Sequence, residues 1–109
     1  MKAVLVSLAG AALLASGAAH AALDNAKAEA MMKKDGCAAC HSIDKKIVGP
    51  AYVDVAAKYK NDKNAQAMLE KKVKDGGVGA WGQIPMPPNA QVPAADIKDL
   101  VTWILTLKK

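Results

Sequence analysis

The chain has 109 residues, enough for one small domain, and carries a formal net charge of +5. All 15 cationic side chains are lysines, and aromatic residues make up only 4% of the chain. Nucleic-acid binding relies on arginine clusters and on aromatic side chains that stack on bases, so the composition argues against that function. A basic surface is compatible with an acidic protein partner.

Residues 1–21 have the three parts of a secretory signal peptide. Met1-Lys2 is a short positive end, residues 3–15 form an almost unbroken apolar run, and Ala19-His20-Ala21 is a small-x-small cleavage site. The alternative is an uncleaved anchor, but the apolar run is shorter than the roughly 20 residues that span a bilayer. We therefore expect export and a mature domain, residues 22–109, that does not insert into a membrane.

The first mature segment, residues 24–35, is rich in strong helix formers. It is followed by Gly36, which can adopt the left-handed conformation that ends a helix. Met31 and Met32 stand at helical spacing, so we expect both to pack into the core. The segment predicts a helix that stops just before the first cysteine.

The pentapeptide Cys37-Ala38-Ala39-Cys40-His41 is the attachment pattern for c-type haem, with two thioether-forming thiols and a proximal histidine. A thioredoxin-like dithiol is one alternative, but it needs a surrounding βαβ sheet, and no alternating strand pattern is found nearby. A structural zinc site wants about four ligands, and only His20 remains as a further histidine. In an exported protein, an unmodified pair of cysteines would tend to oxidise, so a disulfide between Cys37 and Cys40 remains an alternative.

Two further helices are predicted before the next loop, a short one over residues 51–59 and a longer one over residues 64–75. Asn64 is the predicted cap of the longer helix, and Gly76-Gly77 is its stop. Its apolar side chains fall on one stripe, which indicates that this face packs into the core.

Residues 78–92 have no periodicity but hold three prolines around one methionine, in the sequence Ile84-Pro85-Met86-Pro87-Pro88-Asn89. Proline fixes its own φ and moves the preceding residue out of the helical region, so we expect an extended, pre-ordered loop. If His20 leaves with the signal peptide, His41 is the only remaining histidine, and a methionine sulfur becomes the candidate sixth ligand. The other mature methionines are near the attachment motif or on a helical stripe, which leaves Met86.

The last segment, from Pro93 to Lys109, has the strongest helical pattern. Its apolar stripe consists of Ile97, Leu100, Val101, Ile104 and Leu105. Asp96 complements the positive end of the predicted helix, and Lys108 and Lys109 complement its negative end. Trp103 lies beside the stripe, where we expect it to pack on the first helix.

These motifs together resemble those of the short bacterial class I monohaem cytochromes of the c-551 or c-552 type. Five segments carry the resemblance: GCAACH (36–41), VGPAY (48–52), DVAAKY (54–59), WGQIPMPPN (81–89) and WILTLK (103–108). The resemblance implies an all-α class I cytochrome c fold, with four to five short helices wrapped around one covalently attached haem c. The signal peptide predicts a location in the periplasm, and we expect the mature domain to be a monomer.

The resemblance assigns roles to individual residues. It implies that Cys37 and Cys40 hold the haem and that His41 and Met86 are the axial ligands of its iron. The carbonyl of Pro50 would accept the ring N–H of His41, which fixes the histidine tautomer.

Three further positions match residues that line the haem in such proteins. Asn89 would contact the methionine sulfur, and the indole N–H of Trp81 would bond a haem propionate, although core packing is the alternative for this tryptophan. Lys72 stands where some relatives carry an arginine near the propionates, and lysine lacks the planar fork of arginine.

A six-coordinate iron has no open position for a substrate, so the predicted function is one-electron transfer between redox proteins of a respiratory chain, without enzymatic activity. The resemblance implies that an exposed haem edge is framed by Ala38, Ile47, Val48, Ile84, Pro85 and Pro87. Lysines such as Lys33, Lys34 and Lys46 would surround it and suit an acidic partner. Two alternatives remain: a peroxidase-like enzyme if Met86 leaves the iron, and a thiol-disulfide protein if no haem is attached.

Overall fold

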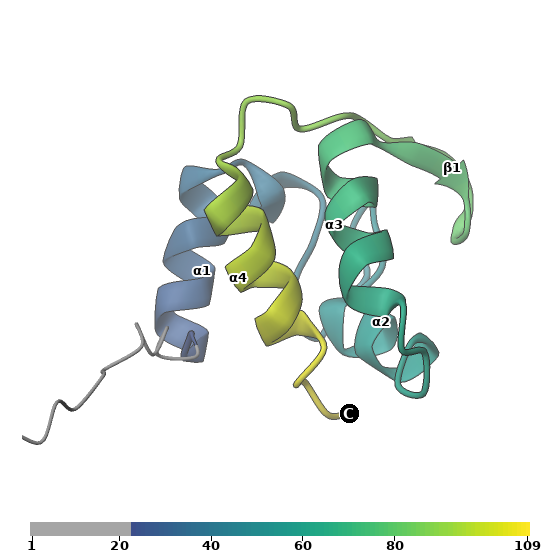
Figure 1. Ribbon diagram of the computed structural model, residues 1–109, viewed down its shortest axis with the longest axis horizontal. Coiled ribbons are helices and arrows are strands. Elements are labelled where there is room, and N and C mark those ends of the chain that lie inside the picture. The colour runs from purple at the N-terminus through teal and green to yellow at the C-terminus, as the bar shows by residue number, and fades with distance from the viewer. Residues whose placement is uncertain (1–22) are drawn as a thin grey trace, which may run out of the picture.

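The computed structural model describes residues 23–109, which form four α-helices, one 3₁₀ turn and a two-stranded hairpin (Figure 1). The elements are α1 (Asn25–Lys34), η1 (Cys37–Ala39), α2 (Tyr52–Lys58), α3 (Ala65–Asp75), β1 (Gly77–Gly79), β2 (Gly82–Met86) and α4 (Ala94–Ile104). The predicted mostly helical fold is confirmed. The predicted signal peptide lies outside the described residues. Between residues 23 and 109, no helix has the length and apolar character needed to cross a bilayer.

Helix α4 is the centre of the packing, because it contacts α1, α2 and α3 (Figure 1). Its buried side chains are Ile97, Leu100, Val101, Trp103 and Ile104. The indole N–H of Trp103 donates to Asn25 Oδ1 at 3.1 Å, which confirms the predicted packing of this tryptophan on the first helix. Burying each large apolar side chain of this stripe contributes about 1.5–3 kcal/mol, so α4 holds the three other helices together.

Helix α1 follows the prediction closely. Asp24 caps it, because its Oδ1 accepts the backbone N–H of Lys27 at 2.7 Å. Gly36 has a φ of 82°, the left-handed conformation expected after the helix. Met32 is buried, and Met31 is partly buried against the core, so their predicted packing is confirmed.

One predicted helix start is confirmed in position, and one predicted helix end is wrong. Asn64 is the N-cap residue of α3 and Gly76 follows its last residue, as predicted, but the Asn64 side chain makes no capping bond; Asp62 Oδ1 accepts the backbone N–H of Asn64 at 2.8 Å. Helix α4 ends at Ile104 rather than reaching the last lysines. There the hydroxyl of Thr106 donates to the carbonyl of Trp103 at 2.6 Å, and Lys109 pairs with Asp54 of α2 at 2.7 Å. Lys108 and Lys109 therefore lie beyond the last residue of the helix, and Lys109 is engaged by Asp54.

The hairpin is the element that sequence reasoning missed. Strands β1 and β2 pair antiparallel, with Gly77 opposite Met86 and Gly79 opposite Gly82. The strands are short and rich in glycine, so they lack the alternation of apolar and polar residues by which strands are predicted. The extended conformation expected around Met86 is present, as the second strand of this hairpin.

A charged cluster joins the end of α1 to the start of α4. Lys34 Nζ lies 2.9 Å from Asp96 Oδ2, and this partner lowers the pKa of Asp96. Burial, and then the neighbouring Asp96, raise the pKa of Asp35. Asp35 is also the residue at the negative end of α1, where a carboxylate is unfavourable.

Replacing Asp35 with asparagine is therefore expected to stabilise the haem-loaded protein at pH 7 by about 1 kcal/mol. A raised pKa in the folded state means that folding is penalised as the pH rises above the ordinary value of 3.8, where the unfolded chain ionises first. The gain should disappear at about pH 3, because Asp35 is then protonated in both states. Urea unfolding at the two pH values measures this gain in the free energy of unfolding. Asp99→Asn is the control, because it removes an equal charge. An equal gain in the control would contradict the explanation.

Candidate functional site

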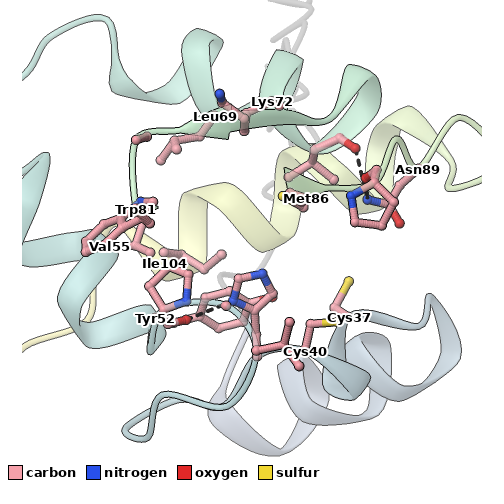
Figure 2. A pocket seen from close by; sticks show the side chains of 18 of the residues that line it. Cys37, Cys40, Tyr52, Val55, Leu69, Lys72, Trp81, Met86, Asn89 and Ile104 are labelled. Carbon is pink, nitrogen blue, oxygen red and sulfur yellow. Dashed lines mark hydrogen bonds between the residues drawn. The ribbon is translucent and has the colours of Figure 1, made fainter. Parts of the chain in front are cut away.

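The helices and the hairpin enclose a cavity of about 290 Å³ (Figure 2). A water molecule occupies about 30 Å³ in the liquid, so this space is much larger than a packing defect. Most of its lining is apolar, with contributions from α2, α3, α4 and the hairpin. All the predicted site residues line it: Cys37, Cys40, His41, Pro50, Trp81, Met86 and Asn89. The structure thus brings together side chains from both halves of the chain.

The attachment motif forms one wall of the cavity. After Gly36 the chain makes the turn η1, in which the backbone N–H groups of Cys40 and His41 both donate to the carbonyl of Cys37, at 3.2 and 3.0 Å. Both thiols are free and half-buried. This tight turn is the reason why the two sulfurs and the imidazole lie on the same side.

The imidazole of His41 is held on two sides. Its Nδ1 lies 2.8 Å from the carbonyl of Pro50, the contact expected from the resemblance, and this leaves Nε2 available as a ligand. The ring stacks on Tyr52, with centroids 4.9 Å apart and planes at 20°, and Tyr52 in turn meets Trp103 edge-on at 5.9 Å. At Gly49 an added Cβ would overlap the imidazole, so only glycine lets this loop approach the ring.

The electrostatics of Cys37 argue against thiol-disulfide chemistry. Burial, and secondarily the charge of Asp35, raise the pKa of the Cys37 thiol. Thiols that exchange disulfides have a lowered pKa, because the thiolate is the nucleophile. The Cys37 thiol therefore lacks the activation that disulfide exchange needs.

Met86 and Asn89 form the facing wall. Figure 2 shows them across the open space from Cys37 and Cys40. Met86 is the last residue of β2, and Asn89 fastens the loop that follows to the end of α3. The side-chain amide of Asn89 donates to the carbonyls of Val73 and Pro87, each at 3.1 Å, and its backbone N–H donates to Val73 as well. Contact between Asn89 and the Met86 sulfur stays a prediction.

Trp81 and Lys72 lie at the rim. Trp81 is 42% exposed, at the tip of the hairpin, so it is not part of the buried core. Its ring is covered by Lys58, whose Nζ lies 4.6 Å from the ring centroid. Lys72 lines the cavity from α3. Propionate contacts for Trp81 and Lys72 stay predictions.

Sequence reasoning missed two residues of the site, Tyr52 and Lys58. Tyr52 follows the Gly-Pro-Ala segment, and only its aromatic character could have indicated that it packs on His41. Lys58 is 22 residues from its partner Ala80, and nothing in the sequence indicated that pairing because the hairpin was not predicted.

The residues of the expected exposed edge are apolar, and most of them line the cavity. Val48, Ile84, Pro85 and Pro87 line it, and Ile47 beside them is 52% exposed. Ala38 differs, because it is partly buried against the core and does not line the cavity. The expected edge therefore consists of the loop around Val48 and the part of β2 around Ile84.

A large apolar cavity with two cysteines and an oriented histidine on one wall, and a methionine on the other, fits a covalently attached haem. The site and the helices around it thus define a small c-type haem protein.

Comparison with known proteins gives the family. The cytochrome c family model matches residues 9–108. The chain is 66% identical over 77 residues to cytochrome c-551 of Allochromatium vinosum, covering 71% of this chain and 82% of that protein. It is 50% identical over 104 residues to cytochrome c-552 of Nitrosomonas europaea, covering 95% of each. The crystal structure of wild-type Nitrosomonas europaea cytochrome c552 matches with a TM-score of 0.70 and 52% identity, over 73% of this chain and 99% of that one.

The chain belongs to the cytochrome c family. It therefore has one covalently bound haem c and is a small electron-carrier cytochrome. Its relatives are electron-transfer proteins rather than enzymes.

Proposed function

We propose that this cytochrome is a periplasmic one-electron carrier, with His41 and Met86 as the axial ligands of its iron, and that it passes electrons between proteins of a respiratory chain without enzymatic activity. One observation carries the proposal: His41 and Met86 line the same cavity, and the imidazole is already oriented by Pro50. When bound, haem c supplies the Fe(II)/Fe(III) couple for this transfer.

The residues around the cavity favour the reduced, ferrous state of the iron. They also limit the movement of its two ligands when the oxidation state changes. A neutral thioether from Met86 raises the reduction potential, and the apolar cavity walls act in the same direction by excluding water. Tyr52 holds the imidazole in place, and Asn89 ties the loop after Met86 to α3. Both ligands are thus fixed by contacts that do not depend on the charge of the iron, so the same geometry serves both oxidation states.

The periplasmic location rests on the sequence. Residues 1–21 combine a positive end, an apolar run and a small-residue cleavage site, the pattern of an exported protein. We propose that cleavage after Ala21 releases a monomeric domain, residues 22–109.

The test is an absorption spectrum of the protein purified from the periplasm, oxidised and then reduced. Haem that survives acid-acetone extraction, together with the weak near-red band of ferric iron bonded to methionine sulfur, is the expected result. Covalent haem without that band, and rapid cyanide or carbon monoxide binding, would favour the open-iron, peroxidase-like alternative. Failure to recover the protein in the periplasmic fraction would contradict the proposed location.

Docking to an acidic redox partner is expected to depend on lysines near the exposed edge. Lys33 and Lys46 are exposed, whereas Lys34 is paired with Asp96 and is less available for a partner. Changing Lys33 and Lys46 to glutamate should slow electron transfer with an acidic redox protein by about tenfold at low salt and reduce its salt dependence. Stopped-flow kinetics measure this effect. The control changes Lys60 and Lys63, two exposed lysines between α2 and α3, to glutamate, which alters the net charge equally; an equal loss in this control would mean that docking is not local.

A further inference from the structure

We propose that Lys58 is a positioning residue, which fastens the tip of the hairpin to α2 and thereby holds Trp81 at the rim of the haem cavity. The inference rests on the proposed function, because it takes the cavity to hold a haem ligated by Met86. It assigns a role in that site to a side chain that does not line the cavity itself.

Two contacts made by the ammonium group of Lys58 carry the proposal. Its Nζ donates to the carbonyl of Ala80 at 2.8 Å and lies 4.6 Å from the centroid of the Trp81 ring. A cation over the face of a tryptophan is attracted by the negative face of the ring. Lys58 thus holds both the backbone and the side chain of the hairpin turn.

The hairpin makes few other contacts with the helices. Figure 1 shows it at the edge of the molecule, beyond the end of α3. Its apolar side chains Val78, Trp81 and Ile84 line the cavity instead of packing in the core between the helices. Among residues 23–109, the bond from Lys58 is the one hydrogen bond that joins residues 78–85 to the helices. Because an isolated two-stranded hairpin is only marginally stable in water, its tip needs this attachment to stay in one position.

The attachment matters because Trp81 covers the rim of the cavity. If the tip moved outward, water would reach the cavity, and water stabilises the more highly charged ferric state. Loss of Lys58 should therefore lower the reduction potential as well as loosen the hairpin. Arginine at this position keeps the donor and the cation and stacks well on aromatic rings, so it should preserve both properties.

The experiment compares Lys58→Met, Lys58→Arg and Lys60→Met in the haem-loaded protein. The Lys60 variant is the matched control, because it removes the same charge from an exposed neighbouring position. Hydrogen exchange by NMR is followed at the hairpin amides and at the two indole N–H groups, and the reduction potential is measured by titration. Trp103 serves as an internal reference, because its buried indole N–H bonds Asn25 in the core.

We expect Lys58→Met to speed hydrogen exchange in the hairpin and at Trp81 by about fivefold, to leave Trp103 unchanged, and to lower the potential more than Lys60→Met does. Lys58→Arg should match the wild type. Equal acceleration at Trp103, or a potential equal to that of the Lys60 control, would overturn the proposal. A wild-type spectrum without the near-red band would instead refute the proposed ligation, so the two failures are distinguishable.

Discussion

Met86→Ala is expected to keep the haem covalently bound but to abolish the near-red band and to lower the reduction potential by on the order of 100 mV or more. The thioether from Met86 would be the only ligand supplied by the wall that faces His41, and alanine has no atom that can replace it. The opened position should also admit cyanide and carbon monoxide without denaturation. Spectroscopy, redox titration and ligand-binding kinetics measure these three effects.

The matched control for this variant is Met31→Ala. Met31 is partly buried against the core but does not line the cavity, so its loss should reduce stability and leave the band intact. If Met86→Ala kept the band, or if Met31→Ala removed it, the ligand assignment would be wrong.

Gly76→Ala should destabilise the protein by about 2–4 kcal/mol and weaken the near-red band. Gly76 has a φ of 72°, and a Cβ there would lie 2.5 Å from the carbonyl oxygen of Met86 and 2.8 Å from the nitrogen of Pro88. Both neighbours are backbone atoms, so the clash can be relieved only by moving the segment that carries Met86. Thermal unfolding and the absorption spectrum measure the two effects.

Gly36→Ala shows what a positive φ costs without a clash. Gly36 has φ 82° and ψ 3°, whereas Gly76 has φ 72° and ψ −173°, a region that side chains avoid more strongly, so the comparison is made on the near-red band and not on stability alone. An added Cβ at Gly36 would meet nothing within 4 Å. It should therefore cost about 1 kcal/mol and keep the band. If the two variants behaved alike, the close approach of Gly76 to the methionine loop would have no influence on ligation.

The helices and the site residues were predictable because their signals are local. The attachment motif occupies five consecutive positions, the proline loop isolates Met86 from any helical face, and the stripe on α4 repeats at helical spacing. These patterns do not require knowledge of the tertiary structure. All the predicted site residues consequently line one cavity.

The features that were missed depend on contacts between distant segments. The hairpin is formed by pairing across a glycine-containing turn, without an alternating pattern, and the role of Lys58 exists only because α2 lies beside that turn. The end of α4 is set by Thr106, whose hydroxyl bonds the carbonyl of Trp103. Asn64 is the N-cap residue of α3 as expected, but the one side-chain bond at this turn comes from Asp62, whose carboxylate accepts the backbone N–H of Asn64.

The two walls of the cavity differ in how permanently they hold the cofactor. The cysteine wall is joined to haem by covalent bonds, whereas the Met86 loop is fastened by the hydrogen bonds of Asn89 and by pairing within the hairpin. The loop can therefore open as a separate unit while the cofactor stays attached, and a denatured chain keeps the cofactor for its next folding attempt. With the proposed ligation, refolding would then depend on an intramolecular encounter between Met86 and the iron, and the rate of that encounter would be independent of protein concentration.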